Sequence, residues 1–154
     1  IRWHFIGQVQ SNKCQLIAQH FAWVHSVSSI KVAMALSQAR SALQNPLNVC
    51  VQVNLMNEVQ KSGVLLEGLE ELLQCVISQP TLNLRGLMCI PPRLLSSQQL
   101  IDYFQAMQHL KADYAEKGIE MDILSMGMSQ DYELAVQSGS TLVRVGNAIL
   151  SRDN

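Results

Sequence analysis

Three small residues follow two consecutive apolar segments near the end of the chain. Ser129 comes after Ile123–Met128, and Gly146 and Asn147 come after Thr141–Val145. Both segments are predicted to be β-strands, and in α/β sheets and barrels ligands bind at the carboxyl ends of the strands. Backbone N–H groups beside a glycine, together with a hydroxyl group, form an anion site. A phosphate bound between the last two strands is therefore one interpretation of the pattern, but the pattern alone favours ordinary turn and capping residues.

Two arginines lie within predicted strands, where a charge is costly unless it is paired. They are Arg85 and Arg144, and Arg144 lies two residues before Gly146, on the same side of its strand. We interpret each as an interior arginine that meets a ligand or a carboxylate. Lys13 and Lys61 follow strand ends, where a lysine can serve as a nucleophile or a phosphate partner, but solvated surface lysines are the commoner case.

Segments with the periods of strands and helices alternate along the chain. No hairpin signal such as Asn-Gly separates consecutive strands, and parallel strands need crossover connections, so the pattern predicts an α/β fold of βα repeats. The predicted strands are Trp3–Val9, Trp23–Val27, Asn48–Asn54, Leu84–Ile90, Ile123–Met128 and Thr141–Val145. The predicted helices are Lys13–Phe21, a helix capped by Ser28 or Ser29 that runs to about Leu43, Leu66–Ser78, Ser97–Lys117, and Gln130–Gln137 with Ser129 as its N-cap and Gly139 at its left-handed end.

Two architectures are compatible with this alternation. Six βα units in an open sheet form a doubly wound fold, whereas six of eight units form part of a (β/α)8 barrel, which typically needs about 250 residues. No linker or low-complexity segment divides the chain, so we predict one domain over residues 1–154. The glycine motifs of dinucleotide sites, P-loops and hydrolase elbows are absent from the sequence.

Composition and charge exclude several classes of protein. The formal net charge is -1, which gives no basic footprint for nucleic acid, and no apolar run approaches the roughly 20 residues that span a membrane. The four cysteines are widely spaced without a CxxC pair, as expected of reduced thiols in a cytoplasmic protein. His4 and His25 lie inside short strands, and we expect them to be hydrogen-bonded core histidines.

Five segments together resemble the pyridoxal phosphate homeostasis protein family. They are Trp3–Lys13 (WHFIGQVQSNK), Val51–Asn54 (VQVN) followed by Glu58, Lys61, Ser62 and Gly63, Arg85–Pro91 (RGLMCIP), Leu124–Asp131 (LSMGMSQD) and Gly139–Ile149 (GSTLVRVGNAI). The matches keep their order from one end of the chain to the other. The resemblance implies a (β/α)8 TIM-type barrel akin to the N-terminal domain of alanine racemase, with pyridoxal 5′-phosphate (PLP) as the cofactor.

The resemblance also implies a role for each residue of the predicted site. Ser129 and the backbone N–H groups of Gly146 and Asn147 would hold the phosphate of PLP, with Met128 beside them. Arg144 would face the pyridine nitrogen and keep it unprotonated, which weakens the ring as an electron sink. This implies a cytoplasmic carrier or buffer of PLP without turnover, with PLP-dependent apoenzymes as partners and a monomeric complete protein. Asn147 stands where the family commonly has threonine, and the family's ending, Phe-Gly-x-Arg, is not kept after Ile149.

The family's pattern places two further strands before the segment that begins at Trp3. Its Schiff-base lysine lies on the first of them, so we expect that lysine upstream of Ile1, with strands three to eight of the barrel in this chain. The alternative function is that of a PLP-dependent racemase-like enzyme, which needs a second catalytic acid or base, typically a tyrosine from another domain. Tyr103, Tyr114 and Tyr132 all fall in predicted helices.

Overall fold

The computed structural model describes residues 1–58 and 61–150, without the side chains of residues 147 and 148. The described residues form an α/β fold in which strands and helices alternate. The chain divides into two compact units, Ile1–Met88 and Cys89–Asn154. A single domain over residues 1–154 stays a prediction. No helix of the described residues has the length and apolar composition that crossing a membrane requires.

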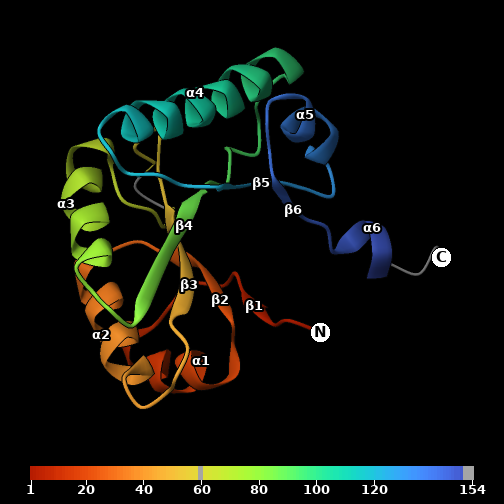
Figure 1. Cartoon of the computed structure of the whole chain (residues 1–154). Coiled ribbons are helices and arrows are strands. Elements are labelled where there is room, and N and C mark those ends of the chain that lie inside the picture. The colour runs from red at the N-terminus through yellow and green to blue at the C-terminus, as the bar shows by residue number, and fades with distance from the viewer. Residues whose placement is uncertain (59–60, 151–154) are drawn as a thin grey trace. The chain divides into compact units, whose positions relative to one another are not determined.

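The first unit is a parallel sheet with helices between its strands. Strand β1 pairs with β2, β2 with β3 and β3 with β4, each pair in parallel, and helices α1, α2 and α3 pack side by side (Figure 1). This arrangement confirms the predicted βα repetition. The strands are β1 (His4–Phe5), β2 (Trp23–Val27), β3 (Leu47–Gln52) and β4 (Leu82–Met88). The helices are α1 (Cys14–His20), which follows the 3-10 turn η1 (Ser11–Lys13), α2 (Ile30–Arg40) and α3 (Leu66–Ile77).

The hydrophobic pattern of the first unit explains its packing. All five residues of β2 are buried, as expected of a parallel strand that is covered on both faces. Helix α3 buries Leu69, Leu72, Leu73 and Val76, which recur at the helical period and form one apolar stripe. Ser29 caps α2, because its hydroxyl oxygen accepts a hydrogen bond from the Val32 N–H at 3.3 Å.

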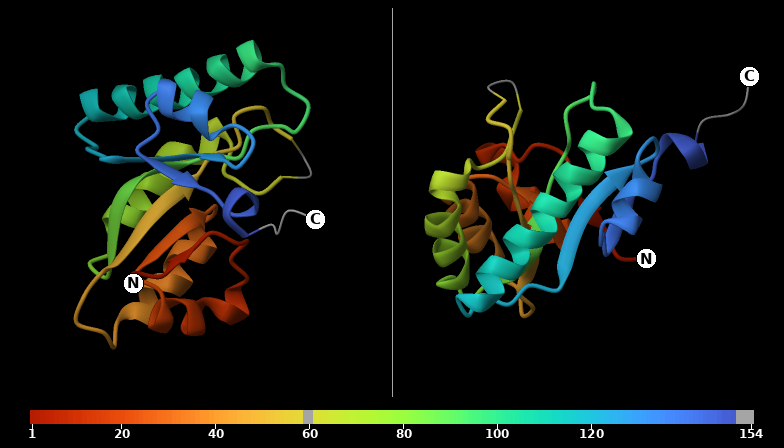
Figure 2. Two further views of the ribbon diagram at one scale, coloured as in Figure 1. Left: turned by 90° about the vertical axis from the view of Figure 1, so that its right-hand side faces the viewer. Right: turned by 90° about the horizontal axis from the view of Figure 1, so that it is seen from above.

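The second unit carries the end of the chain that the sequence singled out. It contains α4 (Ser97–Glu116), β5 (Ile123–Met128), α5 (Tyr132–Gln137), β6 (Leu142–Arg144) and α6 (Asn147–Leu150). Strands β5 and β6 pair in parallel, and α4 and α5 pack on β5 and on each other (Figure 2). The buried side chains of Phe104 and Met107 on α4 and of Leu124 and Met126 on β5 form the core that holds these elements together.

The first strand is much shorter than the apolar run Trp3–Val9 predicts. Only His4 and Phe5 pair with β2, opposite Trp23 and Val24. The carbonyl of Gly7 accepts a hydrogen bond from the Ser26 hydroxyl, so this part of the run is held by a side chain and not by a strand ladder. Hydrophobic composition predicted the position of the strand, whereas the available pairing partners decided its length.

Two predictions about the last segments are wrong. Ser129 does not cap α5; the N-cap residue is Asp131, and Ser129 lies in the turn before it. The segment after β6, where no helix is predicted, contains the short helix α6, which starts at Asn147. The predicted left-handed residue at Gly139 is confirmed, with φ of 90°. The turn between Met128 and Asp131 separates Ser129 from the helix and leaves its hydroxyl group available for another contact.

Candidate functional site

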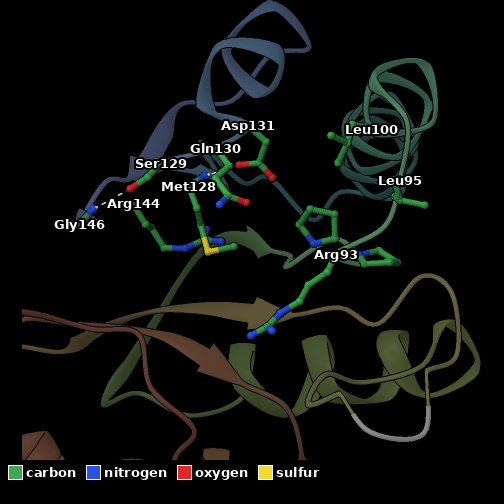
Figure 3. A pocket seen from close by; sticks show the side chains of 11 residues that line it. Arg93, Leu95, Leu100, Met128, Ser129, Gln130, Asp131, Arg144 and Gly146 are labelled. Atoms are coloured by element: carbon green, nitrogen blue, oxygen red, sulfur yellow. Dashed lines mark hydrogen bonds between the residues drawn. The ribbon is translucent and has the colours of Figure 1, made fainter. Parts of the chain in front are cut away.

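The carboxyl ends of β5 and β6 lie side by side and bring two of the predicted site residues into contact. Met128 at the end of β5 pairs with Arg144 at the end of β6. The Ser129 hydroxyl oxygen accepts a hydrogen bond from the backbone N–H of Gly146 at 3.3 Å (Figure 3). A hydroxyl group and a glycine N–H group therefore lie next to each other at adjacent strand ends, which is the arrangement that the sequence indicated.

Arg144 places a positive charge beside this pair. Its guanidinium group donates one hydrogen bond to the Ser125 hydroxyl and another to the Cys89 carbonyl, each at 2.9 Å. Burial raises the pKa of the Cys89 thiol to about 12, against the opposing charge of Arg144, so the thiol is neutral at physiological pH. These two hydrogen bonds hold the guanidinium group in one orientation in the pocket lining.

The turn that contains Ser129 is fixed by a left-handed glycine and by two hydrogen bonds between Met128 and Asp131. Gly127 has φ of 96°, in the left-handed region that other residues rarely adopt, and a Cβ atom there would lie 2.7 Å from the Cβ of Ala135. After Met128 the chain turns back on itself, and the Asp131 N–H donates to the Met128 carbonyl at 3.1 Å. The Asp131 carboxylate in return accepts from the Met128 N–H at 2.6 Å. Both ends of the turn are therefore tied.

These strand ends form one wall of a pocket of about 790 Å³, within the usual range for small-molecule sites (Figure 3). The other wall comes from the segment before α4 and from the first turn of that helix. Arg93 and Arg144 contribute positive charge to the lining and Asp131 contributes negative charge, so the charged side chains of the lining sum to +1. The lining residues are Pro91, Pro92, Arg93, Leu95, Leu100, Met128, Ser129, Gln130, Asp131, Arg144 and Gly146.

Four of the five predicted cofactor-binding residues line this pocket: Met128, Ser129, Arg144 and Gly146. The fifth, Asn147, begins α6 directly after Gly146, and its side chain lies outside the described part of the structure. The roles of all five in binding PLP stay predictions, because their positions alone do not establish a ligand.

Sequence reasoning missed Arg93 and the structural part played by Asp131. Arg93 follows Pro91-Pro92 at the end of the β4 segment, so the rule that ligands bind at the carboxyl ends of strands would have included it. The sequence places Asp131 only within the first turn of the predicted helix Gln130–Gln137. A carboxylate directed back to the N–H of Met128 has no signature in the sequence.

Gly146 tests whether the pocket suits the phosphate of PLP. Its φ is outside the positive range, and a Cβ atom there would meet no atom within 4 Å, so neither the backbone nor the packing requires glycine. Open space beside the Gly146 Cα, next to a backbone N–H and the Ser129 hydroxyl, leaves room for the close approach of a phosphate. The residues present therefore fit the group that the sequence suggested.

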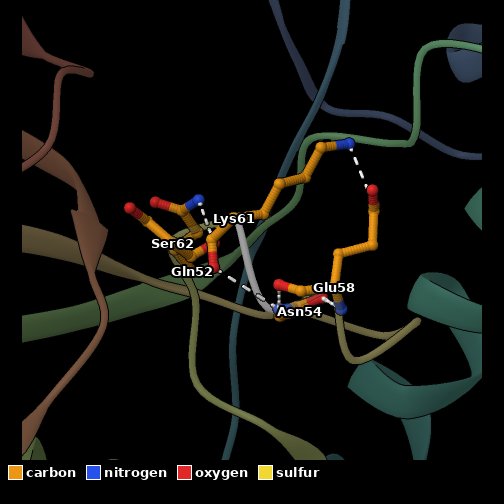
Figure 4. A network of polar contacts seen from close by, with 5 residues as sticks. All are labelled: Gln52, Asn54, Glu58, Lys61 and Ser62. Atoms are coloured by element: carbon orange, nitrogen blue, oxygen red, sulfur yellow. Dashed lines mark hydrogen bonds and ion pairs between the residues drawn. The ribbon is translucent and has the colours of Figure 1, made fainter.

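A second polar network in the first unit has a structural explanation. The side-chain amide of Asn54 accepts from the Glu58 N–H at 3.1 Å and donates to the Glu58 carbonyl at 2.9 Å, and Gln52 donates to the Ser62 carbonyl at 2.7 Å (Figure 4). The sequence favours a solvated surface lysine at position 61, but Lys61 forms an ion pair with Glu58 at 3.0 Å. These contacts hold the segment that follows β3.

The other predicted polar residues of the first unit lie in its core or on its surface. His4 Nδ1 and His25 Nε2 are 2.9 Å apart; His25 is fully buried, as expected of a core histidine, whereas His4 is only half-buried. Arg85 lies 4.7 Å from the ring centroid of Trp23 and donates to the Asn48 side chain at 3.2 Å. A cation–π contact and an amide therefore help to offset the cost of that charge.

Comparison with known proteins agrees with this geometry. The family described as alanine racemase, N-terminal domain, matches residues 2–152. A pyridoxal phosphate homeostasis protein of Pseudomonas aeruginosa is 46% identical over 149 residues, and one of Vibrio alginolyticus is 44% identical over 149 residues. Each of these matches covers 97% of this chain and 64% of the relative, so the chain spans about two thirds of the length of these proteins.

Solved structures show the same relationship. PipY of Synechococcus elongatus, in a structure with PLP bound, is 31% identical with a TM-score of 0.91, covering 98% of this chain and 71% of PipY. Diaminopimelate decarboxylase of M. jannaschii has a TM-score of 0.76 at 13% identity, over 95% of this chain and 43% of the enzyme, which shows a shared fold alone. The chain therefore belongs to the alanine racemase N-terminal domain family, among the relatives named pyridoxal phosphate homeostasis proteins.

Proposed function

We propose that this chain is the phosphate-binding part of a protein that binds PLP and serves in PLP homeostasis. The observation that carries the proposal is the Ser129 hydroxyl next to the Gly146 N–H, beside the Arg144 guanidinium, in one pocket. The relatives at 44–46% identity are named for PLP homeostasis, and PipY has been solved with PLP bound. Both facts support the same ligand for this pocket.

In this proposal Ser129 and the backbone at Gly146 and Asn147 bind the phosphate, and Met128 lies beside them. Arg144 faces the pyridine nitrogen. An arginine is always protonated and has no acceptor, so it can only donate to that nitrogen. In PLP enzymes the cofactor serves as an electron sink. A pyridine ring whose nitrogen is unprotonated is a poor electron sink. The position proposed for Arg144 therefore supports a carrier or buffer of PLP without turnover.

The pocket lining supports the same conclusion about turnover. The racemase-like alternative needs a tyrosine at the cofactor; the described lining residues include none, and the carboxylate of Asp131 already accepts the Met128 N–H. Tyr103 and Tyr114 are buried on α4, and Tyr132 lies on α5 outside the lining. The racemase-like alternative predicts measurable exchange of amino-acid stereoisomers by the full-length protein with PLP, and we expect none above the rate of free PLP.

The proposed fold is a (β/α)8 TIM-type barrel to which this chain contributes strands three to eight. Parallel pairing within each unit and the similarity to PipY support it. We also propose that the complete protein is a cytoplasmic monomer that delivers PLP to apoenzymes. Light scattering tests the monomer, and activation of a PLP-free enzyme by the loaded protein tests the delivery.

A pair of serine variants tests the binding site in the full-length protein. Ser129→Ala removes a hydroxyl group from the proposed phosphate site, and a hydrogen bond to a charged group contributes about 1.5–3 kcal/mol, so PLP affinity should fall at least about tenfold. Ser41→Ala is the matched control, because the Ser41 hydroxyl is exposed and donates to the Gln38 carbonyl within its own turn. Equal PLP affinity of the two variants in equilibrium dialysis would place the phosphate elsewhere.

A further inference from the structure

The Asp131 carboxylate has a position that helix capping does not explain. Asp131 is the N-cap residue of α5, yet its side chain makes no cap hydrogen bond to that helix. It points back along the chain and accepts the Met128 N–H at 2.6 Å. The residue is only 9% exposed, and burial of a carboxylate is unfavourable unless hydrogen bonds compensate. The carboxylate therefore stabilises the turn before α5 and does not cap the helix.

The turn that this carboxylate closes contains Ser129. The Asp131 N–H donates to the Met128 carbonyl and the Met128 N–H donates to the Asp131 carboxylate, so the same two residues are joined twice, across Ser129 and Gln130. The turn starts from Gly127, whose left-handed backbone has no room for a side chain. With both ends held, the Ser129 hydroxyl is directed at the Gly146 N–H.

We propose that Asp131 is a positioning residue for phosphate binding: its carboxylate oxygen fixes the turn that holds Ser129 beside Gly146. The inference rests on the proposed function and adds a residue that does not itself contact the ligand. A negative charge at the edge of a phosphate site repels the ligand, so the carboxylate is useful there for the hydrogen bond that it accepts and not for its charge.

The two roles of the side chain can be separated by substitution. Asp131→Asn keeps an acceptor oxygen in the same place and removes the charge, whereas Asp131→Ala removes both. Glu133→Ala is the matched control, because it removes one acidic charge from the first turn of the same helix and Glu133 does not line the pocket. The ligands are PLP and pyridoxal, which differ only in the phosphate, and all variants are made in the full-length protein.

Asp131→Asn should bind PLP at least as tightly as the original protein. Asp131→Ala should bind PLP about tenfold more weakly than the original protein. Glu133→Ala should bind PLP as the original protein does. Pyridoxal affinity should be the same in all four proteins, because only the phosphate contact depends on the turn. A general loss of folding would instead weaken both ligands together.

Several results would overturn the inference. Equal losses in Asp131→Asn and Asp131→Ala would mean that the charge matters and not the acceptor, and an unchanged Asp131→Ala would mean that the turn holds without it. A parallel loss of pyridoxal would show a disturbance that is not specific to phosphate. If Asp131→Ala does not fold, Asp131→Asn decides alone, since a tenfold loss of PLP affinity in that variant contradicts the role of the oxygen. If the original protein binds no PLP, the proposed function itself fails.

Discussion

Replacement of Gly146 by alanine separates the requirements of folding from those of binding. In the structure a Cβ atom at this position would meet no atom within 4 Å, and the backbone φ is outside the positive range. The substitution therefore introduces no clash and no backbone strain. If the pocket binds a phosphate at the Gly146 N–H, the new methyl group occupies space that the ligand needs.

The expected magnitudes have opposite signs for stability and affinity. An alanine that fits the native backbone restricts the unfolded chain, so the free energy of unfolding should stay the same or rise by about 0.4–1 kcal/mol. Loss of one charge-assisted hydrogen bond to the phosphate costs about 1.5–3 kcal/mol, which weakens PLP binding about tenfold to hundredfold. A variant that is at least as stable and yet binds poorly is not explained by misfolding.

Gly127→Ala is the matched control, because the same substitution meets the opposite conditions. Its Cβ atom would lie 2.7 Å from the Cβ of Ala135 and 3.0 Å from the Cα of Tyr132, and φ is 96°. The left-handed backbone and the overpacking together cost about 2–5 kcal/mol of unfolding free energy. Thermal and urea unfolding without PLP measure stability, and titration with PLP followed by absorbance measures affinity.

The proposed role of Gly146 is wrong if Gly146→Ala binds PLP as tightly as the original protein, because the ligand would then not use the space that the new methyl group fills. It also fails if Gly146→Ala loses as much stability as Gly127→Ala. In that case the glycine would be needed for folding, and weaker binding would have a simpler cause.

Two further predictions concern groups away from the phosphate site or beneath it. Burial lowers the pKa of His4, which contacts His25, below its ordinary value of 6.5, so the unfolded chain binds more protons as the pH falls through this range. The contribution of neutral His4 to the free energy of unfolding is therefore fully present above about pH 6.5, and it is lost as the pH falls through the lower pKa of the folded protein. Urea midpoints measured against pH should show this decline. An equal decline in the His4→Gln variant would contradict the assignment to His4. Because burial raises the pKa of Cys89 to about 12, its thiol should resist iodoacetamide at pH 7.5 in the native protein, whereas the partly exposed Cys75 should react, as peptide mass mapping after a short exposure will show. Alkylation of Cys89 as fast as Cys75 would mean that the second unit opens readily.

Local chemistry in the sequence was sufficient to place most elements of the fold. The hydrophobic periods located β2 and β5 residue for residue, because the strand composition and the turn residues around each agree. The start of α2 followed from the pair Ser28 and Ser29, because a short hydroxyl side chain can reach a backbone N–H three residues later; in the structure Ser29 is the cap. The alternation of strands and helices predicted parallel pairing, because each crossover must return the chain in the same direction.

The sequence also predicted which residues would gather at one place. Ser129, Arg144 and Gly146 lie at or just beyond the ends of consecutive parallel strands, and the ends of such strands meet at one edge of a sheet. The motifs around these residues led to the family and to PLP as the expected ligand. Neither step needed coordinates, since order along the chain and strand direction contain this information.

Only the tertiary structure decided the contacts of individual side chains. A serine before a short helix has the signature of an N-cap, yet the Ser129 hydroxyl contacts Gly146, 17 residues later. The structure also places Asp131 and Arg93 in the pocket lining, which the sequence did not predict. The partner of a side chain depends on the segments that fold against it. Strand β1 ended early where the Gly7 carbonyl bonded to Ser26, a residue 19 positions away. Such long-range contacts depend on distances in space, which composition and spacing along the chain do not determine.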